Sequence, residues 1–238
     1  IEFSKTSEKY KNDADESCRK YWNESKTDGL NEGTLRMWAK QDNYEEYKKV
    51  LKKTIWGKVK KSATSRFFNP YDIAEIVHEM YESQYMCADV DKNLWYRFFK
   101  QRWKPVKGPV CLKKNISTEV FDYFSQRPQE YMADGEDIDP KLWALLAKNG
   151  SQLKQSGFKE NVIKECKQFF TDELDENEPT FLEKLDEKRN LIAFKNGVMD
   201  LDDKNLLFRD GRPDDYISMT TKINFYEYDW EHPIVMDI

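Results

Sequence analysis

The sequence has no phosphate-binding loop of the form Gly-x4-Gly-Lys-Ser/Thr, and none of its nine glycines belongs to such a string. In nucleotide hydrolases this loop surrounds the phosphates with backbone amides, while its Lys and hydroxyl groups handle phosphate charge and magnesium. The absence argues against nucleotide hydrolysis by the usual route. We expect these 238 residues to bind no cofactor and no metal ion.

Long apolar segments are also missing, since no run approaches the roughly 20 residues that a spanning helix needs. The mean hydropathy is −0.91, and 35% of the residues are charged. We therefore expect a soluble, intracellular protein with no membrane partner. The chain begins at Ile1 and shows no basic stretch followed by an apolar core, so we expect no signal peptide and interpret it as part of a longer polypeptide.

Cysteine and histidine are scarce, and their positions match no paired metal-ligand spacing. We expect the thiols to be reduced and to play no part in a metal site. The residues concerned are Cys18, Cys87, Cys111, Cys166, His78 and His232.

Charge of one sign is concentrated in two stretches, although the net charge is only −5. Residues 92–114 hold eight Lys or Arg and no acid, whereas residues 171–187 hold eight acids and one Lys. The total charge therefore says little about partners. The acidic run 172–178 matches no calcium-loop spacing, and it is either a solvated loop or a docking or cation-binding surface.

Apolar periodicity predicts helices in the first third of the chain. Cys18 to Trp22, Leu35 to Ala39 and Asp42 to about Lys53 each carry apolar residues at helical spacing, and Asp42 resembles a helix start. Residues 52–65 are interpreted as a basic connector. Asn69-Pro70 then predicts the start of a buried helix over 70–82.

Beyond residue 82 the pattern predicts an antiparallel meander and then further helices. Its strands are expected at Tyr85–Ala88, Leu94–Phe99 and Trp103–Val106. Helices are expected at 117–126, at 140–148 with Asn149-Gly150 as the end, and at 158–170. A helical turn over 180–185 and closing β-hairpins complete an α+β, mainly helical fold.

Asp89 and Asp91 raise the question of catalysis. Two carboxylates one residue apart on a strand project to one face, as metal-dependent nucleotidyl transfer requires. Alternatively, residues 89–93 form a hairpin turn in which Asp and Asn bond the local backbone. No third carboxylate follows at a recognisable spacing, and we assign no catalytic residue.

Residues 95–104 interleave aromatic rings with cations, which suits a surface that stacks bases and neutralises phosphates. Because successive strand residues face opposite ways, Leu94, Tyr96 and Phe98 are instead expected to fill the core and leave the cations exposed. The cations remain candidate phosphate contacts. The predicted nucleic-acid-binding residues are Arg97, Lys100, Arg102, Lys104 and Lys107.

Several segments resemble known viral proteins. The first fifty residues, through Trp22-Asn23 and Trp38-Ala39-Lys40, resemble the helical module that follows the catalytic domain of many viral and phage primases, although a generic helical hairpin would share the pattern. From Asn69 onward the chain resembles the collar module of poxvirus-type primase-helicases of large DNA viruses. The most specific segments are 194–201 (FKNGVMDL) and 211–218 (GRPDDYIS).

The resemblance implies a helical primase-to-helicase connector over 1–66 and a collar domain over 67–238. It implies a non-catalytic segment that supports assembly of a homo-hexamer and guides DNA into a superfamily-three helicase motor. ATP and magnesium would then bind elsewhere in the longer protein, which would act in the host-cell cytoplasm. Two other functions stay open: a self-contained nucleotidyltransferase using Asp89 and Asp91, and a protein-interaction scaffold.

Overall fold

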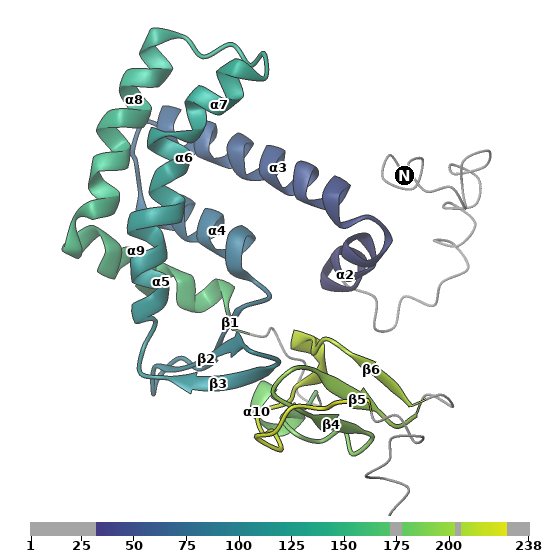
Figure 1. The fold of residues 1–238 in the computed structure, drawn as a ribbon. Coiled ribbons are helices and arrows are strands. Elements are labelled where there is room, and N and C mark those ends of the chain that lie inside the picture. Colours follow the sequence, from purple (N-terminus) through teal and green to yellow (C-terminus); the bar gives the residue numbers. More distant parts are fainter. Residues whose placement is uncertain (1–31, 172–177, 203–205, 228–238) are drawn as a thin grey trace, which may run out of the picture. The chain divides into compact units, whose positions relative to one another are not determined.

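The computed structural model describes residues 32–171, 178–202 and 206–227 (Figure 1). The chain divides into two compact units, residues 1–58 and 59–238. The helix predicted around Cys18 to Trp22 and residues 172–177 of the acidic run lie outside the described residues. The predicted domain boundary after residue 66 stays a prediction.

Two helices, α2 (Glu32–Asp42) and α3 (Tyr44–Thr64), follow one another with one residue between them. The N–H of Glu46 donates to Asn43 Oδ1 at 3.1 Å, so Asn43 caps α3. The predicted start at Asp42 is therefore wrong, because Asp42 is the last residue of α2.

Residues 52–65, interpreted as a basic connector, are helical almost throughout, because α3 continues through them to Thr64. Lys and Ala in this stretch favour helix, and the single Gly57 does not end it. Val59 and Ala63, on this part of α3, are fully buried. The basic composition resembles that of a linker, but the few apolar residues in the stretch keep helical spacing.

Helix α4 (Pro70–Tyr81) confirms the prediction for 70–82. Asn69 accepts a hydrogen bond from the N–H of Asp72 at 2.9 Å, and Pro70 occupies the first helical turn. Ile73, Ile76 and Val77 are fully buried. Helix α4 packs along α9 (Ser156–Phe169). The presence of α9 confirms the helix predicted at 158–170.

Residues 110–125 form one helical stretch that begins earlier than predicted. It comprises α5 (Val110–Asn115), the π-helical turn η3 (Ile116–Val120) and α6 (Phe121–Ser125). The next helix, α7 (Arg127–Ala133), was not predicted. Helix α8 (Pro140–Gly150) confirms the helix predicted at 140–148 and its end at Asn149-Gly150, and the 3₁₀ turn η4 (Ser151–Lys154) follows it directly.

The predicted meander is confirmed as the antiparallel sheet β1 (Tyr85–Asp89), β2 (Leu94–Phe99) and β3 (Arg102–Val106). Aromatic residues cover both of its faces. Trp95 packs on Phe170 at 5.8 Å between ring centres, while Tyr96 packs on Phe181 at 5.2 Å. Simple alternation therefore does not separate core from solvent. Leu94, Tyr96 and Phe98 are only partly buried, whereas Trp95 is fully buried.

The last described part holds α10 (Phe181–Lys184) and a second antiparallel sheet, β4 (Leu191–Ala193), β5 (Val198–Asp200) and β6 (Leu207–Arg209), followed by the 3₁₀ turn η5 (Pro213–Asp215). Ala193, Val198 and Ile217 form its small core. The expected helical turn and β-hairpins are confirmed. The fold is α+β and mainly helical, as predicted.

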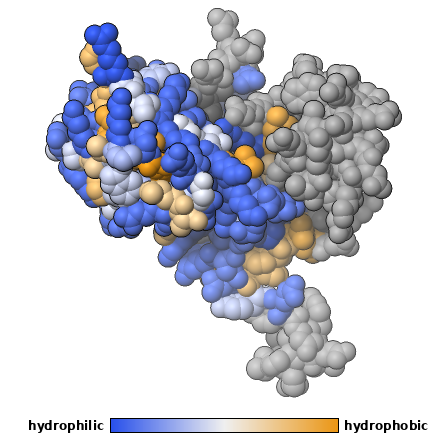
Figure 2. All heavy atoms as spheres, turned by 90° about the horizontal axis from the view of Figure 1, so that it is seen from above, coloured by the Kyte–Doolittle hydropathy of each residue, from blue (hydrophilic) through white to orange (hydrophobic). Residues whose placement is uncertain are grey.

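The surface agrees with the charged composition. On the face drawn in Figure 2 the described residues are largely hydrophilic, and apolar residues form small, separate patches. Within the described ranges, no helix combines the length and the apolar character needed to cross a bilayer.

A test of the helical packing concerns Gly150. A Cβ at this position would lie 2.7 Å from the Cβ of Phe124 on α6, so Gly150→Ala forces α8 and α6 apart. We expect a loss of roughly 1–3 kcal/mol in the free energy of unfolding, measured by urea denaturation. Gly157→Ala on α9 is the control, because nothing lies within 4 Å of its added Cβ. An equal loss in both variants would contradict the packing.

Candidate nucleic-acid interface

The C-terminal segment, residues 206–227, docks on Trp103 of the β2–β3 hairpin. The N–H of Trp103 donates to the carbonyl of Ile217 at 2.7 Å, and its indole Nε1 donates to the carbonyl of Pro213 at 2.7 Å. The indole also packs edge-on against Phe181 at 5.1 Å between ring centres. A buried indole N–H needs such a partner, so the docking satisfies the ring and fixes both chain segments.

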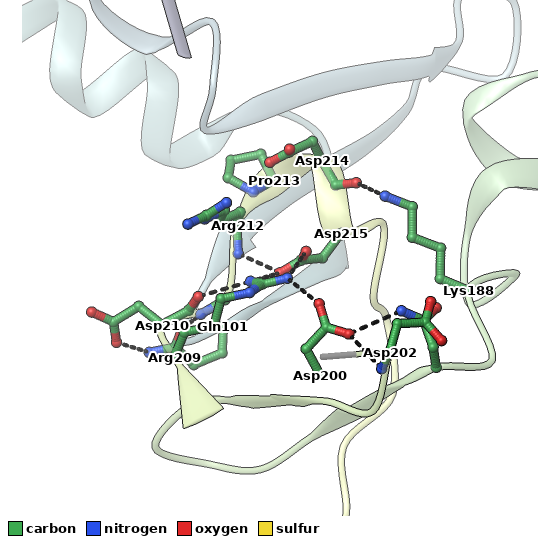
Figure 3. A network of polar contacts seen from close by, with 12 residues as sticks. Gln101, Lys188, Asp200, Asp202, Arg209, Asp210, Arg212, Pro213, Asp214 and Asp215 are labelled. Atoms are coloured by element: carbon green, nitrogen blue, oxygen red, sulfur yellow. Dashed lines mark hydrogen bonds and ion pairs between the residues drawn. The ribbon is translucent and has the colours of Figure 1, made fainter. Parts of the chain in front are cut away.

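Polar contacts continue this docking at the hairpin turn (Figure 3). Gln101 Nε2 donates to Asp210 at 3.3 Å, and the N–H of Gly211 donates to Gln101 Oε1. A Cβ at Gly211 would lie 2.9 Å from the Gln101 carbonyl, so glycine permits this approach.

Arg209 anchors the C-terminal segment internally. Its guanidinium donates to both carboxylate oxygens of Asp215, at 2.8 and 2.7 Å, and lies 3.7 Å from Asp200 (Figure 3). The side chains are 15% and 5% exposed for Arg209 and Asp215. The hydrogen bond to Asp215 is the main reason why the pKa of Arg209 is raised. This pair is therefore a structural ion pair and not a free binding group.

The docking brings cations from distant parts of the chain around one cleft of about 460 Å³. That volume lies within the roughly 300–1,000 Å³ of small-molecule sites. Five of the seven lining residues are basic. The lining residues are Lys100, Gln101, Arg102, Lys104, Lys195, Thr220 and Lys222.

An aromatic ring stands beside the same cations. Phe99, at the end of β2, is 44% exposed. The Nζ atoms of Lys100 and Lys104 lie 5.4 and 5.5 Å from its ring centre, and the Arg97 guanidinium lies at 5.3 Å. Each distance is within the range of a cation–π contact. The ring is therefore both accessible and flanked by positive charge.

The five predicted contact residues do not form one strip. Lys100, Arg102 and Lys104 line the cleft, and Arg102 also donates to the carbonyl of Ser218 at 3.4 Å. Arg97 lies over the ring of Tyr85 as well as Phe99, and its Nε is buried without a hydrogen-bond partner among the described residues. Lys107 is exposed and does not line the cleft.

The cleft is electrostatically unbalanced. Burial lowers the pKa of Lys104, and the nearby charges of Arg102 and Lys100 lower it further. Among the described residues, Asp210 is the one carboxylate bonded to a lining residue, and that residue is the neutral Gln101. An anion bound here would relieve repulsion among the cations.

Sequence reasoning missed Lys195, Lys222 and the role of Phe99. The two lysines stand more than ninety residues after Lys100, and isolated lysines in an acidic chain carry no local signal. The pattern of rings and cations does not set Phe99 apart from its aromatic neighbours, although its position at the strand end exposes it.

Asp89 and Asp91 do not share a strand face. Asp89 is the last residue of β1, and Asp91 lies in the following turn, so the geometry assumed for paired carboxylates is wrong. Both carboxylate oxygens of Asp89 accept from Lys92, at 2.8 Å each, and the side-chain bond is the main reason why the Asp89 pKa is lowered. Within the described residues no three His, Cys, Asp or Glu side chains gather as a metal site.

The chain is similar in sequence to viral proteins named as helicases. Residues 74–235 match the family described as D5 N terminal like. This range includes the β2–β3 hairpin, the C-terminal segment and every residue that lines the cleft.

The relatives are viral proteins named as helicases. The chain is 31% identical over 223 residues to "Putative helicase L207/L206" of Acanthamoeba polyphaga mimivirus, covering 90% of this chain and 22% of the relative. It is 26% identical over 263 residues to "Putative helicase 022R" of Frog virus 3 (isolate Goorha), covering 94% of this chain and 25% of the relative. The chain thus spans about a quarter of the length of these relatives.

The Arg209–Asp215 pair gives a test of the docked segment. Arg209→Met leaves a 5% exposed carboxylate without its guanidinium, and we expect a loss of roughly 3–5 kcal/mol in the free energy of unfolding. Arg209→Met combined with Asp215→Leu should lose less, because no buried charge remains unpaired. Arg189→Met, at an exposed arginine, is the matched control in urea denaturation. A double variant less stable than Arg209→Met would contradict the assignment.

Proposed function

Because the chain belongs to the D5 N terminal like family, we propose that it is a non-catalytic segment of a viral replication primase-helicase. It supports assembly of a hexamer and guides DNA toward an ATP-driven superfamily-three motor, in the host-cell cytoplasm. Residues 1–66 serve as a helical connector and residues 67–238 as a collar. ATP and magnesium bind to the remainder of the protein, since about three quarters of each relative lies outside the matched segment.

The basic cleft is the observation that carries the DNA-binding part of this proposal. DNA binding is driven largely by cations that neutralise phosphates and release counterions. The cleft offers five cations, and no described carboxylate bonds to any of them. Buried and paired cations such as Arg209 are excluded from the contact set, so Lys100, Arg102 and Lys104 are the central residues of the predicted contact set. Arg97 and Lys107 lie at its margin.

Catalysis by Asp89 and Asp91 has no support in this geometry, because the turn separates the two carboxylates and Lys92 holds Asp89. A protein-interaction scaffold is the alternative function that experiments must distinguish from DNA binding. It would bind a partner without any affinity for DNA that weakens with salt.

Reversing two cleft charges tests the proposal. We expect Lys100→Glu with Lys104→Glu to weaken DNA binding at low salt by about tenfold or more, since two phosphate contacts become repulsive. The logarithmic dependence of affinity on salt should become shallower by roughly 0.7–0.9 for each phosphate that is no longer neutralised. Fluorescence anisotropy with labelled DNA at several salt concentrations measures both.

Lys141→Glu with Lys148→Glu is the matched control, because both lysines are exposed on α8 and the change in net charge is identical. Equal weakening in the control pair would assign the effect to total charge. Unchanged binding in the cleft variant would remove the cleft from DNA contact and favour the scaffold.

A further inference from the structure

We propose that the basic cleft and the Phe99 ring together form a site for single-stranded nucleic acid, in which Lys195 and Lys222 hold a backbone phosphate and Phe99 stacks on a base. This inference rests on the proposed DNA-binding function and makes it more specific. It adds three residues to the contact set and assigns a preferred form of the ligand.

The wall of the cleft that carries Lys195 and Lys222 is a built structure. The N–H of Lys195 donates to Ile223 at 2.9 Å, and the N–H of Thr221 donates to Ala193 at 2.9 Å, so two chain segments pair on either side of the lysines. Asn196 and Phe225 exchange two further hydrogen bonds of 2.8 Å. The backbone of this wall is therefore held before any ligand arrives.

Thr220 and Lys222 are held within one turn of this wall. The N–H of Lys222 donates to Thr220 Oγ1 at 3.3 Å, and Lys222 has a positive φ of 64°. Since this conformation is uncommon for a residue with a Cβ, the surrounding contacts must maintain it. Both residues line the same cleft as the hairpin cations. A phosphate in the cleft would therefore meet positive charge from both chain segments.

The exposed ring favours a single strand over a duplex. Lys100 and Lys104 line the cleft and also lie within 5.5 Å of the Phe99 ring centre, so the ring stands next to the cations that would hold the backbone. A base can stack on such a ring only if the face of the base is free. In a duplex, neighbouring base pairs cover the faces of each base. A cleft of about 460 Å³ is large enough for a phosphate and its sugar.

Two sets of variants test the site by anisotropy with labelled oligo-dT and with a duplex of equal length. Phe99→Leu keeps an apolar side chain and removes the aromatic face. In this variant we expect oligo-dT affinity to fall roughly 5- to 150-fold with duplex affinity unchanged. The separate variant Phe99→Trp keeps an aromatic face and should bind oligo-dT like the unmodified chain. Lys195→Gln with Lys222→Gln should reduce the salt slope for oligo-dT by about 0.7, for the one phosphate that the two lysines hold.

The outcomes separate this inference from the DNA-binding proposal. If the Phe99 and Lys195/Lys222 variants bind oligo-dT like the unmodified chain while Lys100→Glu with Lys104→Glu does not, the single-strand site is overturned and DNA binding stands. Equal loss of duplex binding in Phe99→Leu also overturns it. A free nucleoside triphosphate that binds as tightly as oligo-dT would identify a mononucleotide pocket instead. If the unmodified chain binds neither DNA, both proposals fail.

Discussion

The docking of Trp103 on the segment 213–217 is the interaction on which the functional surface depends. Two hydrogen bonds of 2.7 Å and the packing on Phe181 join the β2–β3 hairpin to the C-terminal segment. Each bond contributes about 0.5–1.5 kcal/mol net, and the buried indole adds a large apolar area. Without this docking, the cations at 100–104 and those at 195 and 222 would belong to separate surfaces, because nothing in the local sequence relates them.

Pairing, and not charge alone, separates the structural from the functional cations. Arg209 is largely buried and bonded through both terminal guanidinium nitrogens to Asp215, so its charge is already satisfied. Lys100 and Lys104 instead face other cations and an exposed ring. Gathering unpaired cations costs stability, since like charges repel. A protein retains such an arrangement where an anion offsets the repulsion, which favours the cleft over the exposed lysines of the helices as the binding surface.

The elements predicted well are those whose signals are local. Asn69-Pro70 and the apolar spacing after it define α4, and the runs of β-branched and aromatic residues define the first sheet. Failures occurred where distant contacts decide the outcome. The π-helical turn at 116–120 and the helix α7 carry no such local signal, and the helical stretch 110–125 begins seven residues before the predicted start. Residues 52–64 look like a linker, yet burial of Val59 and Ala63 keeps them helical.

The candidate site shows the same division. Three of the five predicted contact residues line the cleft, and they could be predicted because they form a cluster of cations within five positions of the sequence. Arg97 stands just before this cluster, but its place between Tyr85 and Phe99 follows from strand register and from packing that only the fold reveals. Lys195 and Lys222 join the site only because the C-terminal segment docks on the hairpin, and the sequence does not predict that docking. Local pattern thus predicted the chemistry of the site, whereas tertiary structure determined which residues share it.

One hairpin serves two purposes through its two faces. In the register of β2 and β3, Arg97 lies opposite Lys104 on one face, while Phe98 lies opposite Trp103 on the other. The first face carries these two cations and also the buried Trp95, which packs on Phe170, and the second face holds the C-terminal segment. Because both faces belong to the same pair of strands, a change at Trp103 would displace Lys195 and Lys222 without touching any cation. Weaker binding alone therefore does not identify a contact residue. The salt slope counts the phosphates that the protein neutralises, and it would fall with the displaced lysines as well.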